Sequence, residues 1–157
     1  MLFGGGQEKG YRPGTENTCM IAGLGKAAEL IISNINKYTA HMTSMCNYLE
    51  LSLSNAFPGK VYFNVKSDVI KLPNTLSVAF NFDKITGEKL LSHAAGISAS
   101  TGAACHTGGK SSILLASGVP DELVSKSLRL SVGRETSKTD IDNAIETLKQ
   151  ALEKFSS

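Results

Sequence analysis

The sequence has no tryptophan, few aromatic residues and little excess charge of either sign. Aromatic residues make up 6% of the 157 residues, and the 16 Lys and Arg exceed the 14 Asp and Glu by a formal net charge of only +2. A surface that binds nucleic acid normally needs a strong basic excess or aromatic side chains on which bases stack. The composition therefore argues against nucleic acid as a partner.

Cysteine is also scarce. The three cysteines, Cys19, Cys46 and Cys105, lie far apart, and none belongs to a CxxC pair or a Cys/His cluster with zinc spacing. We therefore expect reduced thiols in the cytosol, no disulfide framework and no bound metal. The sequence shows neither a signal peptide nor an apolar run near the ~20 residues that cross a bilayer, so we expect no membrane association.

Apolar residues alternate between helical and strand periodicity along the chain. Steps of three and four over residues 17–57 predict one long helix, with Asn17 or Thr18 as its cap. Residues 60–65, 72–82, 96–100 and 127–133 are typical of short strands, and residues 86–95, 111–117, 121–126 and 137–155 of helices. For the terminal helix we expect Ser137 or Thr139 as the cap and a buried side formed by Ile141, Ile145, Leu148 and Leu152. We expect a mixed α/β fold with α+β character, in which helices cover one small sheet within a single domain.

Cys105 is the candidate nucleophile. It lies in STGAACHTGGK, where glycines and small side chains are typical of a mobile loop. A thiol is a strong nucleophile even when it is mostly protonated, and the adjacent His106 offers a group that can accept its proton. A buried cysteine on a tight turn would give the same pattern, and the residues alone leave both interpretations open.

Arg134 is a candidate ligand for a carboxylate. It follows the alternating strand LRLSVG, and a planar guanidinium at the end of a strand suits a carboxylate group. The alternative is a surface arginine paired with Glu135 or Asp140, which the residues alone favour.

The glycine-rich segment GGGQEKGYRPGTEN is a candidate phosphate site. Consecutive glycines can expose backbone N–H groups to an anion, and Thr15 adds a hydroxyl group. The spacing matches neither GxGxxG nor a P-loop, however, and a glycine turn stiffened by Pro13 explains the segment equally well.

Several motifs occur together in a familiar order. GGGQEKGYRPGTEN, LPNTLSVAF, STGAACH and LRLSVGRET resemble, in this order and spacing, the C-terminal part of the cysteine desulfurase/selenocysteine lyase family. These are NifS-like, pyridoxal-phosphate-dependent enzymes of the class V aminotransferase group. The resemblance covers essentially the whole chain, and FGGGQE, RPGTEN and GAACH are more similar to the selenocysteine lyase branch than to the bacterial-type desulfurases.

The resemblance implies roles for individual residues. Cys105 stands where the family keeps the cysteine that attacks the selenium or sulfur of L-selenocysteine or L-cysteine, so that L-alanine is released. Arg134 stands where an arginine holds the substrate carboxylate. Thr15 matches a threonine that reaches the cofactor of the other subunit in a homodimer, whereas Arg12 and Asn74 lie in matching motifs without an assigned role. An acceptor protein or a reductant is implied as the recipient of the chalcogen.

The resemblance also implies what the chain lacks. The family's Schiff-base lysine, the histidine on the cofactor ring and the aspartate at the pyridine nitrogen lie upstream of the glycine motif and have no counterpart here. We expect residues 1–16 to be the end of a large domain, residues 17–57 an inter-domain helix and residues 58–157 a small C-terminal domain. We expect no covalently bound pyridoxal phosphate and no catalysis by this chain alone. A persulfide-donating desulfurase domain and a non-catalytic dimerisation or partner-binding module are the alternatives.

Overall fold

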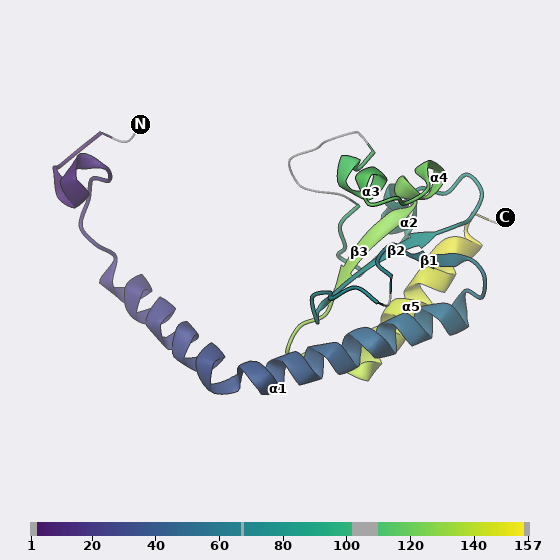
Figure 1. The fold of residues 1–157 in the computed structure, drawn as a ribbon, viewed down its shortest axis with the longest axis horizontal. Helices are drawn as coiled ribbons and strands as arrows, with labels where there is room; N and C mark the ends of the chain where they lie inside the picture. The colour runs from purple at the N-terminus through teal and green to yellow at the C-terminus, as the bar shows by residue number, and fades with distance from the viewer. Residues whose placement is uncertain (1–2, 67, 102–109, 156–157) are drawn as a thin grey trace. The chain divides into compact units, whose positions relative to one another are not determined.

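The computed structural model describes residues 3–66, 68–101 and 110–155, and the chain divides into two compact units, Met1–Lys37 and Tyr38–Ser157. The long helix predicted from the sequence is present as α1, Thr18–Ala56, which begins in the first unit and ends in the second (Figure 1). Asn17 caps it, since its side chain accepts a hydrogen bond from the N–H of Met20 at 3.1 Å.

The second unit contains a three-stranded antiparallel sheet. Its strands are β1, Val61–Phe63, β2, Thr75–Phe80, and β3, Ser127–Ser131, in the order β1-β2-β3. The register places Leu76 opposite Leu130 and Val78 opposite Leu128. Because side chains alternate along a strand, these four apolar residues share one face of the sheet.

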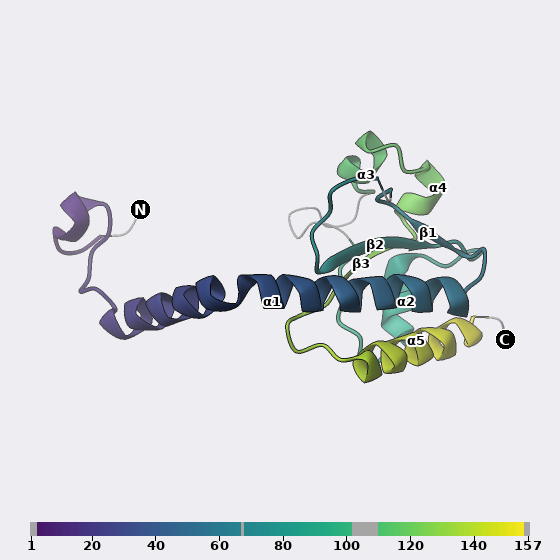
Figure 2. The same cartoon turned by 60° about the horizontal axis from the view of Figure 1, so that its bottom comes forward.

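Two long helices contribute to the core on this apolar face. The second half of α1 and the terminal helix α5, Lys138–Glu153, lie side by side beneath the sheet (Figure 2). The core that they form with the sheet includes Met45, Leu49, Leu53, Ile141, Ile145, Leu148 and Leu152. The apolar stripe predicted for the terminal helix is therefore confirmed, and its cap is Ser137, which forms a capping box with Asp140.

Three short helices complete the second unit. These are α2, Gly87–His93, which is capped by Thr86, and α3, Ser112–Ala116, and α4, Asp121–Val124. The segment containing α3 and α4 packs Val119, Leu123 and Val124 on the other face of the sheet, against Ala79. The strand predicted over residues 96–100 is wrong in its extent, because only Ser100 pairs, through an isolated bridge to Arg129.

The first half of α1 differs from the second in its surroundings. Ile21, Leu24, Ile31 and Ile35 of the predicted apolar stripe are exposed within the chain, at 57, 72, 52 and 48%. An 18-residue window of α1 has a mean hydropathy of 1.2 and, by length and composition alone, is apolar enough to cross a membrane. Core helices of soluble proteins meet the same criterion, so the expectation of no membrane association is not tested by it and stays a prediction.

Candidate functional site

Two regions contain the residues singled out by the sequence. The first unit carries Arg12 and Thr15 in the loop that precedes α1, and the second unit carries Asn74 and Arg134 near one end of the sheet. Cys105 and His106 fall within residues 102–109, which lie outside the described residues.

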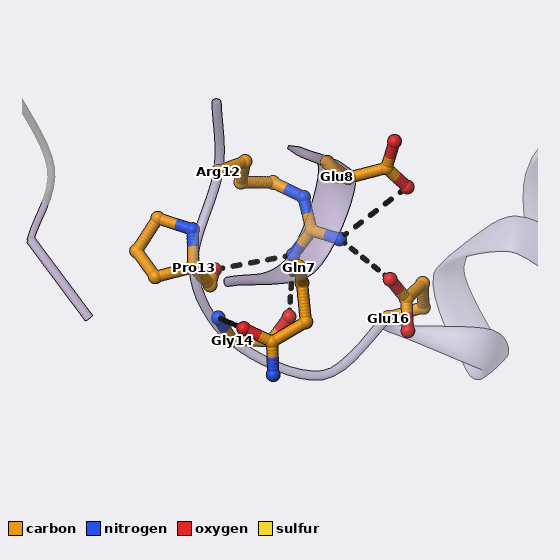
Figure 3. Close-up of polar contacts among 6 residues, drawn as sticks. All are labelled: Gln7, Glu8, Arg12, Pro13, Gly14 and Glu16. Atoms are coloured by element: carbon orange, nitrogen blue, oxygen red, sulfur yellow. Dashed lines mark hydrogen bonds and ion pairs between the residues drawn. The ribbon is translucent and has the colours of Figure 1, made fainter. Parts of the chain in front are cut away.

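The Arg12 guanidinium contacts residues on both sides of it in the loop (Figure 3). Its Nη1 donates to the Gly14 carbonyl at 2.8 Å and to the Pro13 carbonyl at 3.3 Å. Its Nη2 lies 2.8 Å from Glu16 Oε1 and 3.9 Å from Glu8 Oε1. A guanidinium can hold several partners at once because its donors form a rigid planar fork.

The glycines of this loop allow segments to approach closely. A Cβ atom on Gly4 would lie 2.5 Å from Pro13 Cβ, so no other residue fits there without a shift of the backbone. The structure therefore supports the interpretation of the segment as a tight turn against Pro13, and Gly14, at a φ of 92°, adopts the left-handed conformation that glycine favours.

Thr15 is exposed, and its polar groups are available. Among the residues that the structure describes, neither its hydroxyl nor its N–H forms a hydrogen bond. A hydroxyl and an N–H on one residue are neutral donors that suit an oxygen of a phosphate group. The residue present therefore fits one edge of the phosphate of pyridoxal phosphate, the cofactor that the resemblance implies.

The segment that contains Cys105 is held at both of its described ends. On the upstream side, Ser100 and Arg129 exchange two backbone hydrogen bonds of 3.2 and 2.7 Å, which join the chain to β3. On the downstream side, the Lys110 ammonium pairs with the Asp121 carboxylate, and Ser111 caps α3 through the N–H of Leu114 at 3.3 Å. The upstream end thus pairs with the edge of β3, and the downstream end leads into α3, which lies on the face of the sheet that carries Ser127 and Arg129.

A pocket of about 200 Å³ lies between these two ends. Its wall is made of hydroxyl-bearing residues, one arginine and apolar residues of α3 and β3: Ser77, Ser100, Thr101, Ser111, Ile113, Leu114, Ser127, Leu128 and Arg129. Hydroxyl groups and a guanidinium are donors for a carboxylate, and the apolar residues exclude water from part of the space. The pocket therefore combines donors for an anionic group with an apolar wall.

Hydrogen bonds hold two of the pocket hydroxyls in place. The amide Nδ2 of Asn64 donates to Ser77 Oγ at 2.9 Å and to Ser127 Oγ at 3.0 Å. Ser127 in turn donates to the Leu123 carbonyl at 2.9 Å. This network connects all three strands of the sheet region with α4, so the polar face has a fixed arrangement.

Arg134 has partners that the alternative interpretation predicted. Its Nε lies 3.4 Å from Glu135 Oε1, and its guanidinium lies 5.6 Å from the centre of the Tyr38 ring. The side chain is 54% exposed, and Arg134 is not among the described residues that line the pocket. Its role as a carboxylate ligand stays a prediction.

Asn74 occupies a structural position close to the end of β3. Its carbonyl accepts a hydrogen bond from the N–H of Val132 at 3.0 Å, and its Oδ1 accepts one from the Thr75 hydroxyl at 3.1 Å. Asn74 thus joins the start of β2 to the end of β3. Its partner Val132 lies two residues before Arg134 in the sequence.

Arg129 is the residue that the sequence reasoning missed. It pairs with Ser77 across β2 and β3, and Leu128 and Leu130 on either side of it are buried in the core. The alternation in SLRLS could have identified it, because an arginine between two buried leucines must lie on the opposite face of the sheet.

Among the described residues, three groups outside the pocket have shifted pKa values. Desolvation raises the pKa of the buried Cys46 thiol, and the hydrogen bond to Asp142 raises the pKa of the Tyr48 hydroxyl. Hydrogen bonds from the backbone and the side chain of Ser137 lower the pKa of Asp140. Core packing, an exposed tyrosine–aspartate hydrogen bond and a helix cap explain these three shifts, so none of them indicates a further reactive group.

Comparison with known proteins shows similarity along almost the whole chain. The model of the class V aminotransferase family matches residues 5–144. The selenocysteine lyases of Xenopus tropicalis and Homo sapiens are 48 and 45% identical, over 96 and 97% of this chain and 36 and 35% of their own length. A cysteine desulfurase IscS of Clostridium botulinum is 39% identical over 94% of this chain and 38% of its own length. The chain thus spans little more than a third of the relatives that it matches.

Solved structures show the same relation. A NifS-like protein, 28% identical, superposes with a TM-score of 0.77 and covers 98% of this chain and 38% of that one. A NifS-like protein from Rickettsia africae, 29% identical, has a TM-score of 0.74 and covers 98 and 39%. The fold expected from the sequence, helices on a small sheet, is confirmed.

Proposed function

Because this chain belongs to the class V aminotransferase family, we propose that it is the C-terminal part of a pyridoxal-phosphate-dependent selenocysteine lyase. The observation that carries the proposal is the pocket of serine, threonine and arginine residues that lies between the two ends of the Cys105 segment. Similarity to selenocysteine lyases over almost the whole chain supports the choice of substrate.

The proposed reaction converts L-selenocysteine to L-alanine and leaves selenium on Cys105. The Cys105 sulfur forms a bond to selenium as the carbon–selenium bond of the substrate breaks, and the carbon takes up a proton to become the methyl group of alanine. A thiol reductant or an acceptor protein then removes the selenium, and reduction of the sulfur–selenium bond restores the thiol. Pyridoxal phosphate, when bound, supplies the electron sink for breaking the carbon–selenium bond.

Two arginines compete for the substrate carboxylate. The resemblance implies that Arg134 binds the substrate carboxylate, but Glu135 and Tyr38 already contact its guanidinium. Arg129 lines the pocket together with Ser100 and Ser111, and none of the ion pairs between described residues involves it. We therefore propose Arg129 as a second candidate, and the two residues can be separated by experiment.

Thr15 is proposed to donate to the phosphate of the cofactor held mainly by the other subunit of a homodimer. This arrangement explains why its hydroxyl and N–H have no partner among the described residues. The 157 residues alone are proposed to be inactive, because no residue here matches the family's Schiff-base lysine. We place the protein in the cytosol, where its thiols would stay reduced.

A chimera tests the function directly. These residues would replace the matching segment of Homo sapiens selenocysteine lyase, and alanine formation from L-selenocysteine would be measured together with cofactor absorbance. We expect Cys105→Ala to abolish selenide release with the absorbance unchanged, and the matched control Cys19→Ala, an exposed cysteine, to keep full activity. Undiminished turnover by Cys105→Ala would contradict the proposal.

The same chimera separates the two arginines. Replacement of the carboxylate ligand by lysine should raise KM for L-selenocysteine at least about tenfold, since a bidentate pair is lost. We expect this result for Arg129→Lys and a smaller change for Arg134→Lys. The reverse ranking would assign the carboxylate to Arg134.

A cysteine desulfurase is the second candidate function, favoured by the 39% identity to IscS. The ratio of kcat/KM for L-selenocysteine to that for L-cysteine in the chimera distinguishes the two enzymes. A third possibility, a non-catalytic dimerisation module, is favoured by the exposed apolar residues of α1. Light scattering of the 157-residue chain tests it, and a monomer at high concentration would count against it.

A further inference from the structure

The guanidinium of Arg12 is occupied by partners from its own loop. Its four contacts reach the carbonyls of Gly14 and Pro13 and the carboxylates of Glu16 and Glu8 (Figure 3). Two carboxylates facing one guanidinium leave a formal excess of one negative charge. A phosphate or carboxylate would meet this negative excess, so Arg12 is poorly suited to bind an anion itself.

The contact with Gly14 fixes the peptide group that carries the N–H of Thr15. The Gly14 carbonyl and the Thr15 N–H belong to the same peptide bond, which is trans, and they therefore point in opposite directions. The Gly14 N–H is held as well, because it donates to Gln7 Oε1 at 3.2 Å. With Gly14 held on both sides, the Thr15 N–H is directed away from the guanidinium.

The loop maintains a conformation that a free chain would avoid. Glu8 and Lys9 have φ angles of 50° and 55°, in the left-handed region that residues other than glycine rarely adopt. Such residues persist only where surrounding contacts hold them. Here the N–H of Tyr11 donates to the Glu8 carbonyl at 3.1 Å, and the Arg12 guanidinium lies near the Glu8 carboxylate. The shape of the loop is therefore formed in advance and depends on Arg12.

We infer that Arg12 is a positioning residue, which holds residues 7–16 in the form that presents the N–H and hydroxyl of Thr15 to an anionic group. The positioning role is supported by the contacts of Arg12, whereas the identity of the anion as the phosphate of pyridoxal phosphate rests on the proposed function. A lysine could not replace the arginine, because an ammonium group is a point charge and lacks the planar fork.

Backbone 15N relaxation of the 157-residue chain tests the positioning role. Rigid backbone has an order parameter near 0.85 and flexible backbone one below about 0.6. We expect Arg12→Ala to lower the order parameters of Gly14 and Thr15 from the rigid to the flexible range. Arg12→Lys should lower them nearly as far, whereas a purely electrostatic role would be rescued by lysine.

Matched controls lie in the same unit. Glu8→Gln weakens only the 3.9 Å contact and should leave Gly14 and Thr15 rigid. Lys26→Ala removes a cation and its 2.9 Å pair with Glu29 on α1, and should also have no effect on the loop. Order parameters at Gly14 and Thr15 that stay in the rigid range in both Arg12 variants would overturn the inference.

A titration with inorganic phosphate excludes the competing role. If Arg12→Ala abolished phosphate binding while the order parameters stayed unchanged, Arg12 would be an anion ligand and the inference would be overturned. In the chimera, Arg12→Ala and Thr15→Ala should both raise the pyridoxal phosphate concentration needed for half-saturation. If Thr15→Ala had no such effect while Arg12→Ala still loosened the loop, the proposed function would fail and the positioning role would stand.

Discussion

Residues 3–37 and residues 38–155 are stabilised by different kinds of interaction. In the second unit, Leu53, Val78 and Leu148 are almost fully buried in a core shared by the sheet, α1 and α5. In the first unit no hydrophobic residue among those described is buried, and the loop is held by Arg12 and Gln7. The two units therefore contribute differently: the second supplies most of the stability, and the first supplies a shaped polar loop.

The largest expected effect concerns the core. Leu53→Ala removes a side chain that is 0% exposed and should lower the free energy of unfolding by about 2–5 kcal/mol, because a cavity remains. Leu24→Ala, the matched change in the first unit at 72% exposure, should change it by less than about 0.5 kcal/mol. Urea unfolding followed by circular dichroism measures both. Equal losses of unfolding free energy in the two variants would contradict the prediction and would mean that Leu24 contributes to stability as much as the core residue Leu53 does.

Two glycines should respond in opposite directions. A Cβ atom on Gly87 would lie 2.8 Å from the Ser127 carbonyl oxygen, so Gly87→Ala should destabilise the protein by about 1–3 kcal/mol. Gly25 has no atom within 4 Å of the corresponding position, and Gly25→Ala should favour the helix by about 0.5–1 kcal/mol. Thermal unfolding compares the two. A neutral Gly87→Ala would show that the sheet and α2 can move apart.

The smallest effect concerns the cap of α5. Ser137→Ala removes the hydroxyl that accepts from the N–H of Asp140 at 3.2 Å and should cost about 1 kcal/mol. The same contacts lower the folded-state pKa of Asp140 below its ordinary value of 3.8, so its contribution is complete above that value and is lost as the pH falls through the lower folded pKa. Unfolding measured from pH 5 to pH 2 should show this loss in the wild type and less of it in Asp140→Asn. Parallel pH curves for the two proteins would contradict the prediction.

The sequence predicted the second unit well where local patterns determine the structure. The spacing of Ile141, Ile145 and Leu148 gave the buried side of α5, and Ser137 was one of the two caps considered. Prediction from the sequence failed where a residue's contacts come from distant parts of the chain. Ser100 pairs with Arg129, which lies far from it in the sequence, and a local pattern does not predict such a contact. The strand expected at residues 96–100 is therefore present only as a single bridge.

The candidate site shows the same division. The sequence indicated Arg134 as a carboxylate ligand because it follows a strand. The pocket wall instead contains Arg129, whose position depends on the register of β3 against β2. The role of Arg12 could not be read from the motif, because it depends on how its side chain turns back onto the Gly14 carbonyl. The stripe on the first half of α1 predicted a helix correctly, but periodicity cannot tell which surface covers an apolar face.

The bridge between Ser100 and Arg129 also bears on how the sheet meets other molecules. Unpaired strand edges are templates for aggregation, and here the outer edge of β3 is occupied at Arg129, while β1 at the opposite edge is only three residues long. Little of the backbone is left for another strand to join. Precipitation of the purified chain, where it occurs, should therefore respond to detergents or to polar substitutions on the first half of α1 rather than to changes at the sheet edges.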